Sequence, residues 1–416
     1  MTRCPRDLRY LFIFVGMGAL LVALSTGKAA RADAEAPSTV FWDGSHLAAV
    51  RADKMDDDPR YTEVLKRLRK NAEISRKRGP YSVMDKKDVP PSGDKHDYLS
   101  YARYWWPNPD TKNGLPYVRR DGRTNKELLA KGDRQTIGTL YDDVETLALA
   151  GYLLKDDRYA QHAAWLVRTW FLDPQTKMNP HMRYGQAVPG RKKGRGAGII
   201  DTRYFIRVLD SVALLNETDA WSDADQAAFV AWMKEYLDWL QHDPMGVDEA
   251  GKRNNHGTWY DAQVAAIAMF VGERELARQI VERAKTKRIA KCIQPDGRQP
   301  EELGRTKGLH YSVFNMSAMS ILARIGEHLG IDLWHYQAPN GSSLRRGLEF
   351  VRPYLLGETE WPHEQIEEMD ISPSDMGLFY LAAMRYDEPK YLEVLERVGD
   401  GRPAKFEYAR LQFPMK

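Results

Sequence analysis

The feature that most constrains the fold is a long succession of segments in which apolar residues recur at helical spacing. From about Arg60 onward these segments follow one another, separated by turns rich in glycine, proline and aspartate. Alternation at the strand period is sparse, so we expect an all-α protein. The pattern predicts helices over residues 61–77, 135–154, 159–171, 202–215, 224–241, 257–270, 273–287, 311–329, 344–355 and 375–384.

Short polar turns join consecutive predicted helices, which favours antiparallel helix hairpins. No strict sequence repeat is visible, so the pattern does not support a solenoid of consensus units. The chain has 416 residues, of which 43% are hydrophobic, and can therefore bury a large core in one big domain or in two. Helical periodicity alone also permits an unrelated α-bundle.

Three long stretches interrupt the helical pattern, at about residues 85–125, 173–201 and 288–309. Loops of this length are uncommon in compact domains and are often functional. We therefore expect binding or catalytic residues in them.

The N-terminus has the layout of a secretory signal peptide. Three arginines precede an apolar run over residues 10–24, and Ala30-Arg31-Ala32 follows as a small-x-small cleavage site. The run is shorter than the ~20 residues of a membrane helix, although a retained anchor is the alternative. We expect residues 1–32 to be removed on export to the periplasm or the cell exterior, leaving residues 33–416 as one catalytic domain without membrane association.

Charge and cysteine content exclude several classes of protein. Removing residues 1–32 lowers the formal charge from +3 to about −1, so no global basic field for nucleic acid remains. An acidic polymer would have to bind a local cationic patch. Cys4 lies in the leader and Cys292 stands alone, so neither an intrachain disulfide nor a cysteine metal cluster can form in the exported chain.

Residues 254–260, Asn-Asn-His-Gly-Thr-Trp-Tyr, place an amide, an imidazole and two aromatic rings where an amphipathic helix begins. His256, Trp259, Tyr260 and Gln263 follow the i, i+3, i+4, i+7 rule and would share one face, which suits a sugar. The alternative is that Asn254 caps the helix and His256 is a partly buried structural histidine.

A second cluster, Arg305-Thr-Lys307-Gly-Leu-His310-Tyr311, follows about fifty residues later. Together the two clusters resemble the alginate-lyase superfamily of polysaccharide lyases, whose active site joins an Asn–His pair to an arginine and a tyrosine. The resemblance implies an (α/α) toroid, an incomplete barrel of helix hairpins. It also implies the catalytic residues Asn255, His256, Arg305 and Tyr311.

The segment Asp94–Pro107 is similar to the aromatic sugar-binding motif in the N-terminal half of that family, so the similarity extends over about residues 81–315. The rival interpretation of its rings is a packed core stripe, because Tyr98, Tyr101 and Trp105 fall at helical spacing. The Asn–His pair is followed by Gly257-Thr258, unlike the best-known mannuronan lyases. In this position the sequence resembles relatives that act on mannuronan and glucuronan.

A uronate polymer requires three things of a lyase: a group that neutralises the C6 carboxylate, a base for the C5 proton and an acid for the C4 oxygen. Asn255, His256 and Arg305 can supply hydrogen bonds and positive charge to the carboxylate. Tyr311 suits the proton transfers, and we expect the nearby cations to draw its pKa down from ~10. The resemblance implies a syn elimination on mannuronate by one tyrosine, whereas guluronate would require a second group such as His256.

Mannuronate and glucuronate differ only at C2, away from the reacting atoms, so contacts outside the catalytic residues must distinguish them. The cationic run over residues 190–196 lacks the ending of a phosphate loop and is either a polyanion contact or a solvated loop. The residues that we expect to bind substrate are His96, Tyr98, Tyr101, Tyr104, Trp105, Tyr184, Gln186, Arg195, Asn254, Trp259, Tyr260, Lys307 and His310.

Other interpretations remain open at the level of sequence. Arg305 could pair with a neighbouring glutamate and Tyr311 could be a core aromatic. A toroid glycoside hydrolase would need a carboxylate pair, and a non-catalytic sugar-binding protein would need only the aromatics. We expect no cofactor and no metal, since no compact ligand spacing occurs. The candidate carboxylates for a hydrolase are Asp201, Asp261, Glu301 and Glu302.

Overall fold

The structure is a computed structural model that describes residues 36–52, 58–191, 193–369, 373–399 and 408–414. The chain divides into two units, residues 1–34 and 35–416, and all the described residues belong to the second. The proposed signal peptide, with Cys4, lies outside the described residues. Within the described part, no helix is both long and apolar enough to span a bilayer.

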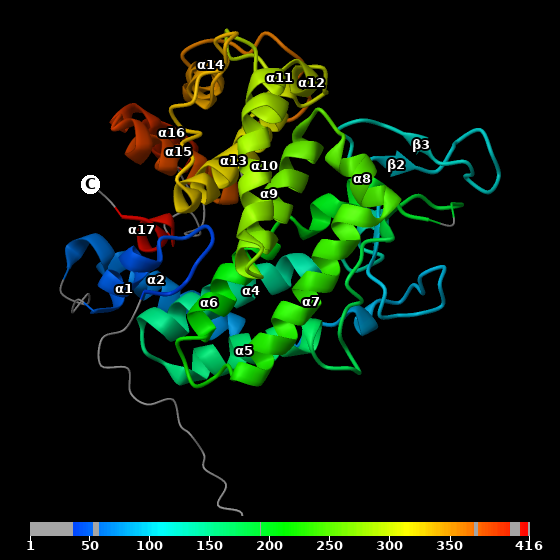
Figure 1. Ribbon diagram of the computed structural model, residues 1–416. Helices are drawn as coiled ribbons and strands as arrows, with labels where there is room; N and C mark the ends of the chain where they lie inside the picture. Colours follow the sequence, from blue (N-terminus) through cyan, green and yellow to red (C-terminus); the bar gives the residue numbers. More distant parts are fainter. Residues whose placement is uncertain (1–35, 53–57, 192, 370–372, 400–407, 415–416) are drawn as a thin grey trace, which may run out of the picture. The chain divides into compact units, whose positions relative to one another are not determined.

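All ten predicted helices are confirmed, with boundaries shifted by a few residues (Figure 1). Helices that the periodicity did not predict add to them, notably α1 and α8. The longer helices are α1 (Gly44–Ala52), α2 (Pro59–Ser75), α4 (Arg134–Leu153), α5 (Asp157–Phe171), α6 (Phe205–Leu215), α7 (Asp223–His242), α8 (Pro244–Ala250), α9 (Asn255–Phe270), α10 (Arg274–Ala284), α13 (Gly308–Leu329), α14 (Leu344–Leu356), α15 (Pro373–Tyr386) and α16 (Leu392–Gly399). The short ones are α3 (Lys126–Leu129), α11 (Ala290–Cys292), α12 (Pro300–Leu303) and α17 (Ala409–Gln412).

Local signals set the helix boundaries. At the start of α7 the Ser222 hydroxyl accepts the Asp225 N–H at 3.1 Å, and the Asp225 carboxylate accepts the Ser222 N–H at 3.0 Å. Helices α13 and α14 end at Gly330 and Gly357, whose φ angles of +71° and +74° favour glycine. These caps lie at the ends that the sequence pattern predicts.

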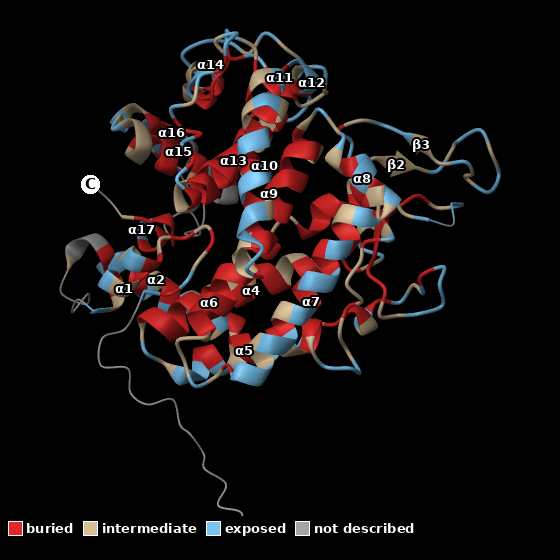
Figure 2. Ribbon diagram, in the orientation of Figure 1, coloured by how far each residue is buried: buried red, intermediate tan, exposed pale blue. Residues whose placement is uncertain are grey.

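The helices form two layers, as expected for an (α/α) toroid. Helices α4, α6, α9, α13 and α15 contact one another in chain order and form the inner layer. Along α4, α6, α9 and α13 nearly every turn is buried, whereas α5, α7 and α10 carry exposed stripes on their outer faces (Figure 2). A helix that packs on all sides needs apolar or small residues around its whole circumference, as α9 has over most of Gly257–Ala268.

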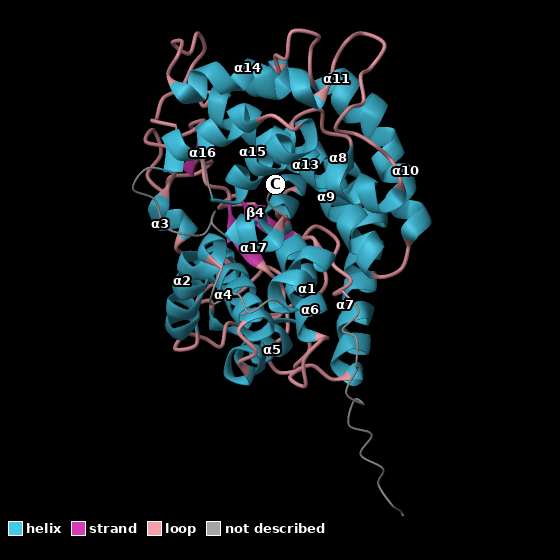
Figure 3. Ribbon diagram, turned by 90° about the vertical axis from the view of Figure 1, so that its left-hand side faces the viewer, coloured by secondary structure: helices cyan, strands magenta, loops and turns pink. Residues whose placement is uncertain are grey.

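The few strands belong to the first two long loops (Figure 3). Strand β1 (Leu99–Tyr101) pairs in parallel with β4 (Tyr184–Ala187) and so joins the first loop to the second. Strands β2 (Trp105–Trp106) and β3 (Val118–Arg119) form an antiparallel pair that extends beyond α8 in Figure 1. The segment His96–Pro107 is therefore extended rather than helical, so its rings do not form a helical stripe.

Candidate active site

A cavity of about 270 Å³ gathers residues from all three long loops and from the N-terminal ends of α9 and α13. It brings together residues that lie as far as 273 positions apart in the sequence, from Ala102 to Asp375. Those of its lining residues that the sequence predicted are Tyr104, Trp105, Gln186, Arg195, Asn254, Asn255, His256, Arg305, His310 and Tyr311. The four proposed catalytic residues therefore all line this one cavity.

Asn255 begins α9 and is 1% exposed. Its backbone N–H and its side-chain amide both donate to the buried carboxylate of Glu302, at 2.5 and 2.6 Å. Burial raises the pKa of Glu302 to about 7, although these donors and the nearby Arg305 oppose the shift. Glu302, on α12, thus holds Asn255 instead of forming an ion pair with Arg305.

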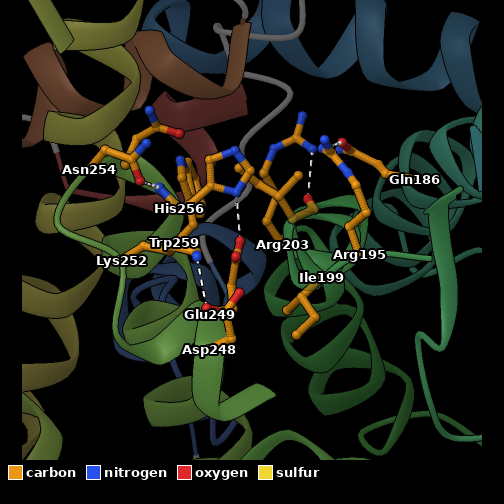
Figure 4. A network of polar contacts seen from close by, with 12 residues as sticks. Gln186, Arg195, Ile199, Arg203, Asp248, Glu249, Lys252, Asn254, His256 and Trp259 are labelled. Carbon is orange, nitrogen blue, oxygen red and sulfur yellow. Dashed lines mark hydrogen bonds and ion pairs between the residues drawn. The ribbon is translucent and has the colours of Figure 1, made fainter. Parts of the chain in front are cut away.

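His256 is held by a glutamate that the sequence did not reveal. The Asn254 side chain caps α9 by accepting the His256 backbone N–H at 3.3 Å, and the imidazole Nδ1 lies 2.6 Å from Glu249 Oε1 (Figure 4). Glu249 is on α8 and is 1% exposed, whereas the His256 side chain is 22% exposed and lines the cavity. The second ring nitrogen, Nε2, is the one left for a substrate.

Arg305 is fixed by Asp121 from the first long loop. Its Nε and Nη2 donate to the two oxygens of Asp121 at 3.0 and 2.8 Å, a bidentate pair. Burial alone would raise the pKa of Asp121, but the hydrogen bonds and charge of Arg305 outweigh it and lower the pKa to about 2. Nothing near Asp121 in the sequence marked it as a partner of Arg305.

The Tyr311 hydroxyl lies between two polar groups. Arg305 Nη2 donates to it at 3.0 Å, and the Tyr104 hydroxyl lies 2.7 Å away. Burial and the neighbouring Tyr104 raise the pKa of Tyr311 well above its ordinary value, and Arg305 opposes this without cancelling it. The expectation of a lowered pKa is therefore wrong for the free site, because desolvation exceeds the effect of one cation.

Three predicted substrate-binding residues are part of the core. Trp259 and Tyr260 are 2% and 5% exposed, and the Tyr260 hydroxyl donates to the Leu240 carbonyl at 2.7 Å. Tyr98 is fully buried and its hydroxyl donates to Asp201 at 3.2 Å. On the proposed sugar-facing side of α9, His256 lines the cavity, whereas the residues that follow it are buried because α9 is an inner helix beyond its first turn.

Other predicted contacts lie outside this cavity. His96 Nδ1 is 2.6 Å from the Lys177 carbonyl oxygen, and Lys307 pairs with Glu367. Tyr101 and Tyr184, from the paired strands β1 and β4, line a separate cavity. The pairing of β1 with β4 therefore places Tyr101 and Tyr184 in a cavity other than that of the proposed catalytic residues.

Most of the cavity's positive charge comes from arginines that were not predicted from the sequence. Six arginines line it, and Asp375 is the one carboxylate among its described lining residues. Arg103, Arg195 and Arg203 form no ion pair with any described residue, and burial lowers the pKa of Arg103 and Arg195. The arginines that the sequence did not single out are Arg103, Arg119, Arg134 and Arg203. Arg103 precedes Tyr104 in the aromatic motif, but nothing marks Arg203.

Gly257, which follows the Asn–His pair, is explained by packing. A Cβ there would lie 2.1 Å from the Lys252 carbonyl oxygen and 2.5 Å from Arg288 Nη1. Thr258 is fully buried, and neither residue lines the cavity. Glycine at position 257 is therefore required by the close packing of the start of α9 against Lys252 and Arg288.

The carboxylates proposed for a hydrolase do not form a pair in this cavity. Asp201 is buried and forms an ion pair with Arg134, Asp261 forms one with Arg288, and Glu302 holds Asn255. Glu301, the fourth candidate, is exposed. Among the described residues, no group of three or more histidines, cysteines or acids is arranged to hold a metal ion.

A two-layered ring of helices whose cationic cavity contains an Asn–His pair, an arginine and a tyrosine defines an (α/α)-toroid polysaccharide lyase. The profile of the alginate lyase family matches residues 82–361. The chain belongs to this family.

Solved structures agree with this assignment. The chain is similar to an alginate lyase from Bacteroides ovatus, with 36% identity and a TM-score of 0.85, over 91% of this chain and 99% of that one. It shares its fold with alginate lyase A1-III from Sphingomonas species A1, with 15% identity and a TM-score of 0.54, over 92% and 98% of the two chains. A variant of A1-III complexed with a tetrasaccharide matches with 15% identity and a TM-score of 0.57, over 93% and 98%. A search of curated proteins returned no match.

Proposed function

We propose that this lyase cleaves a β-1,4-linked uronate polymer, either polymannuronate as in alginate or glucuronan, by β-elimination. The observation that carries the proposal is the convergence of Asn255, His256, Arg305 and Tyr311 in one cavity with an excess of arginines. The positive charge of this cavity matches a polymer that carries one carboxylate on each sugar. The solved relatives are described as alginate lyases, which makes alginate the first substrate to test.

The proposed reaction begins with neutralisation of the substrate carboxylate. Removing the C5 proton places further negative charge next to a group that is already charged. The Asn255 amide has a second hydrogen beyond the one given to Glu302, and His256 Nε2 lies on the same wall. These two groups would bind the carboxylate, and Arg305 would add permanent charge.

Tyr311 is the proposed base and acid. The phenolate takes the C5 proton, and the resulting phenol gives its proton to the C4 oxygen as the C4–O bond breaks, so each turnover regenerates the phenolate. The raised pKa means that the free site holds the phenol, so its proton must leave before the first step. Tyr104, whose hydroxyl lies 2.7 Å away, is a half-buried residue and offers a route to solvent.

The cavity also supports a preference for the configuration at C5. In mannuronate and glucuronate the C5 hydrogen and the C4 oxygen lie on the same face of the sugar ring. A single tyrosine on that face can therefore remove the C5 proton and protonate the C4 oxygen. Guluronate, inverted at C5, would need His256 Nε2 or another group opposite Tyr311. We therefore propose that the mannuronate or glucuronate configuration is cleaved faster than the guluronate configuration.

One assay tests this function. Purified protein is offered polymannuronate, polyguluronate, glucuronan and hyaluronan, while the ultraviolet absorbance of the 4,5-unsaturated uronate is followed. Absorbance should rise with polymannuronate or glucuronan. Saturated reducing ends formed without absorbance would instead indicate a hydrolase, and cleavage of polyguluronate alone would contradict the proposed role of Tyr311.

We also propose that the lyase acts after export, in the periplasm or outside the cell. The support is the charged start, apolar run and Ala30-Arg31-Ala32 site of the N-terminus. A high-molecular-weight polyanion is met more readily there than in the cytoplasm.

A further inference from the structure

Glu249 carries a buried carboxylate whose one hydrogen-bond partner among the described residues is an imidazole. Its Oε1 lies 2.6 Å from His256 Nδ1, and its Oε2 has no hydrogen-bond partner in the described part of the chain. Glu249 is 1% exposed. A buried carboxylate is costly unless it is paired, so such a contact indicates a role beyond packing.

The backbone around Glu249 is held firmly. Helix α8 begins at Pro244, and the Asp243 side chain accepts the Met245 N–H at 3.0 Å. Gly246 packs so closely that a Cβ would lie 1.9 Å from the Leu240 carbonyl oxygen. This end of α8 therefore has little freedom to move against α7.

The corner between α8 and α9 is held by Arg288, which is 1% exposed. Its guanidinium donates to the carbonyls of Ala250 at 3.0 Å and Lys252 at 2.6 Å, and to the Asp261 carboxylate of α9 at 2.7 Å. Arg288 thus links the helix that carries Glu249 to the helix that carries His256. The 2.6 Å contact is set by these anchors rather than by two mobile side chains.

An ionised carboxylate only accepts hydrogen bonds, so the imidazole nitrogen that it contacts must carry the hydrogen. With Nδ1–H committed to Glu249, the remaining nitrogen, Nε2, is the one that meets the cavity. A charged ring then presents Nε2–H to a substrate carboxylate, and a neutral ring presents a lone pair to a C5 proton on its side. The contact between Glu249 and His256 Nδ1 is therefore compatible with both roles of His256, binding the substrate carboxylate and accepting a C5 proton.

We propose that Glu249 is a positioning residue that holds His256 in the Nδ1–H form and directs Nε2 toward the uronate. This inference rests on the proposed function, because His256 is assigned there to the substrate carboxylate. Glu249 is not among the residues that line the cavity, so its effect on the reaction passes through the imidazole.

The decisive variant is Glu249→Gln, which keeps the shape of the side chain. A glutamine amide can accept from Nδ1–H or donate to a bare Nδ1, so it no longer selects one form of the ring. Turnover on the best substrate should fall by on the order of 10–100-fold, the loss typical when the partner that orients a metal-bound histidine is removed. KM should change less, because the arginines of the cavity are intact.

A spectroscopic measurement separates positioning from packing. In protein labelled with ¹⁵N at histidine, two-bond ¹H–¹⁵N spectra at alkaline pH should show His256 with its hydrogen on Nδ1. The signal is assigned by its loss in His256→Gln. In Glu249→Gln the hydrogen should move partly or wholly to Nε2.

Chemical rescue gives a second, independent readout. Glu249→Ala leaves a space beside Nδ1, and added formate should restore part of its turnover while having no effect on His256→Ala. The matched control is Asp248→Asn, the adjacent residue on α8. The Asp248 carboxylate is 59% exposed and pairs with Lys252 at 2.8 Å, so its neutralisation should leave both the turnover and the His256 spectrum unchanged.

Two results would overturn the proposal: hydrogen on Nε2 of His256 in the wild-type protein, or wild-type turnover together with an unchanged spectrum in Glu249→Gln. The spectrum needs no substrate, so the two proposals can fail separately. If none of the four polymers is cleaved but His256 carries its hydrogen on Nδ1, the proposed function fails and the positioning by Glu249 stands.

Discussion

The guanidinium of Arg305 lies over the ring of Tyr311, 4.0 Å from the ring centroid, and its Nη2 donates to the Tyr311 hydroxyl at 3.0 Å. One cation therefore contacts both the face and the oxygen of the proposed base. In a partly desolvated cavity such a contact stabilises the phenolate that the elimination requires.

Replacing Tyr311 with phenylalanine should nearly abolish turnover. The change keeps the ring and its packing but removes the hydroxyl, so kcat should fall by at least the ~10²–10⁴-fold associated with one positioned acid–base group. Steady-state kinetics on the best polymer measure this, and circular dichroism checks the fold. The control is Tyr101→Phe, whose hydroxyl donates to Asp88 at 2.6 Å in the separate cavity. Near-normal turnover of Tyr311→Phe would remove it as the base and make Tyr104 or His256 the next candidate.

Asp121→Asn should impair catalysis and lower stability in a pH-dependent way. The substitution breaks the bidentate ion pair that fixes Arg305, so kcat should fall while the polymer still binds. The folded-state pKa of about 2 lies below the ordinary value of 3.8, so the ionised pair stabilises the fold above about pH 4. That contribution is lost as the pH falls through 2.

Urea unfolding of both proteins at pH 6 and at pH 2 tests the stability of the Asp121 pair. The wild type should be the more stable at pH 6, and the difference should shrink at pH 2. A difference of equal size at both pH values would mean that the Asp121 charge is not what stabilises the fold.

Arg203→Gln should weaken substrate binding more than it slows the chemistry. Arg203 lines the cavity and forms no ion pair with a described residue, so its charge is available to a uronate carboxylate. A hydrogen bond to a charged group contributes about 1.5–3 kcal/mol, so KM should rise roughly ten-fold or more. KM should also become less dependent on salt. Arg298→Gln is the control, because Arg298 is half-exposed and pairs with Asp296. An equal rise in KM for both variants would argue against a direct contact.

Turnover should persist in the presence of a chelator. The neutralisation of the substrate carboxylate is assigned to Asn255, His256 and Arg305, which already supply hydrogen bonds and charge at the reacting group. The assay is elimination measured before and after dialysis against a strong chelator. Loss of activity that one divalent metal restores would refute this assignment.

The exported protein should begin near residue 33. N-terminal sequencing of material from the periplasm or the medium measures this directly. Met1 recovered in a membrane fraction would mean that the apolar run over residues 10–24 is a retained anchor.

Much of the architecture could be predicted from the sequence. Each of the ten helices has a repeating apolar pattern, and caps such as Ser222 and Gly330 are local signals. Helix α8 was missed because seven residues are too short to show a helical period. Because α8 was not predicted, Glu249, which lies on α8 and contacts His256, was not predicted as a site residue.

The sequence could not distinguish rings that face the cavity from rings in the core. Trp259 and Tyr104 look alike as aromatic residues beside polar ones, yet Trp259 packs inside and Tyr104 meets Tyr311. Which face of a helix or strand is buried depends on the layer in which it lies. That layer is set by contacts with elements far away in the chain.

By itself the sequence determined the helical class, the hairpin order and the family to which the residues Asn255, His256, Arg305 and Tyr311 point, because periodicity, turns and motifs are local. Only the tertiary structure decided that Asp121 holds Arg305 across 184 positions, and that burial raises the pKa of Tyr311. Ion pairing and desolvation depend on three-dimensional distance and on exclusion of water. Neither quantity is encoded by any short stretch of the chain.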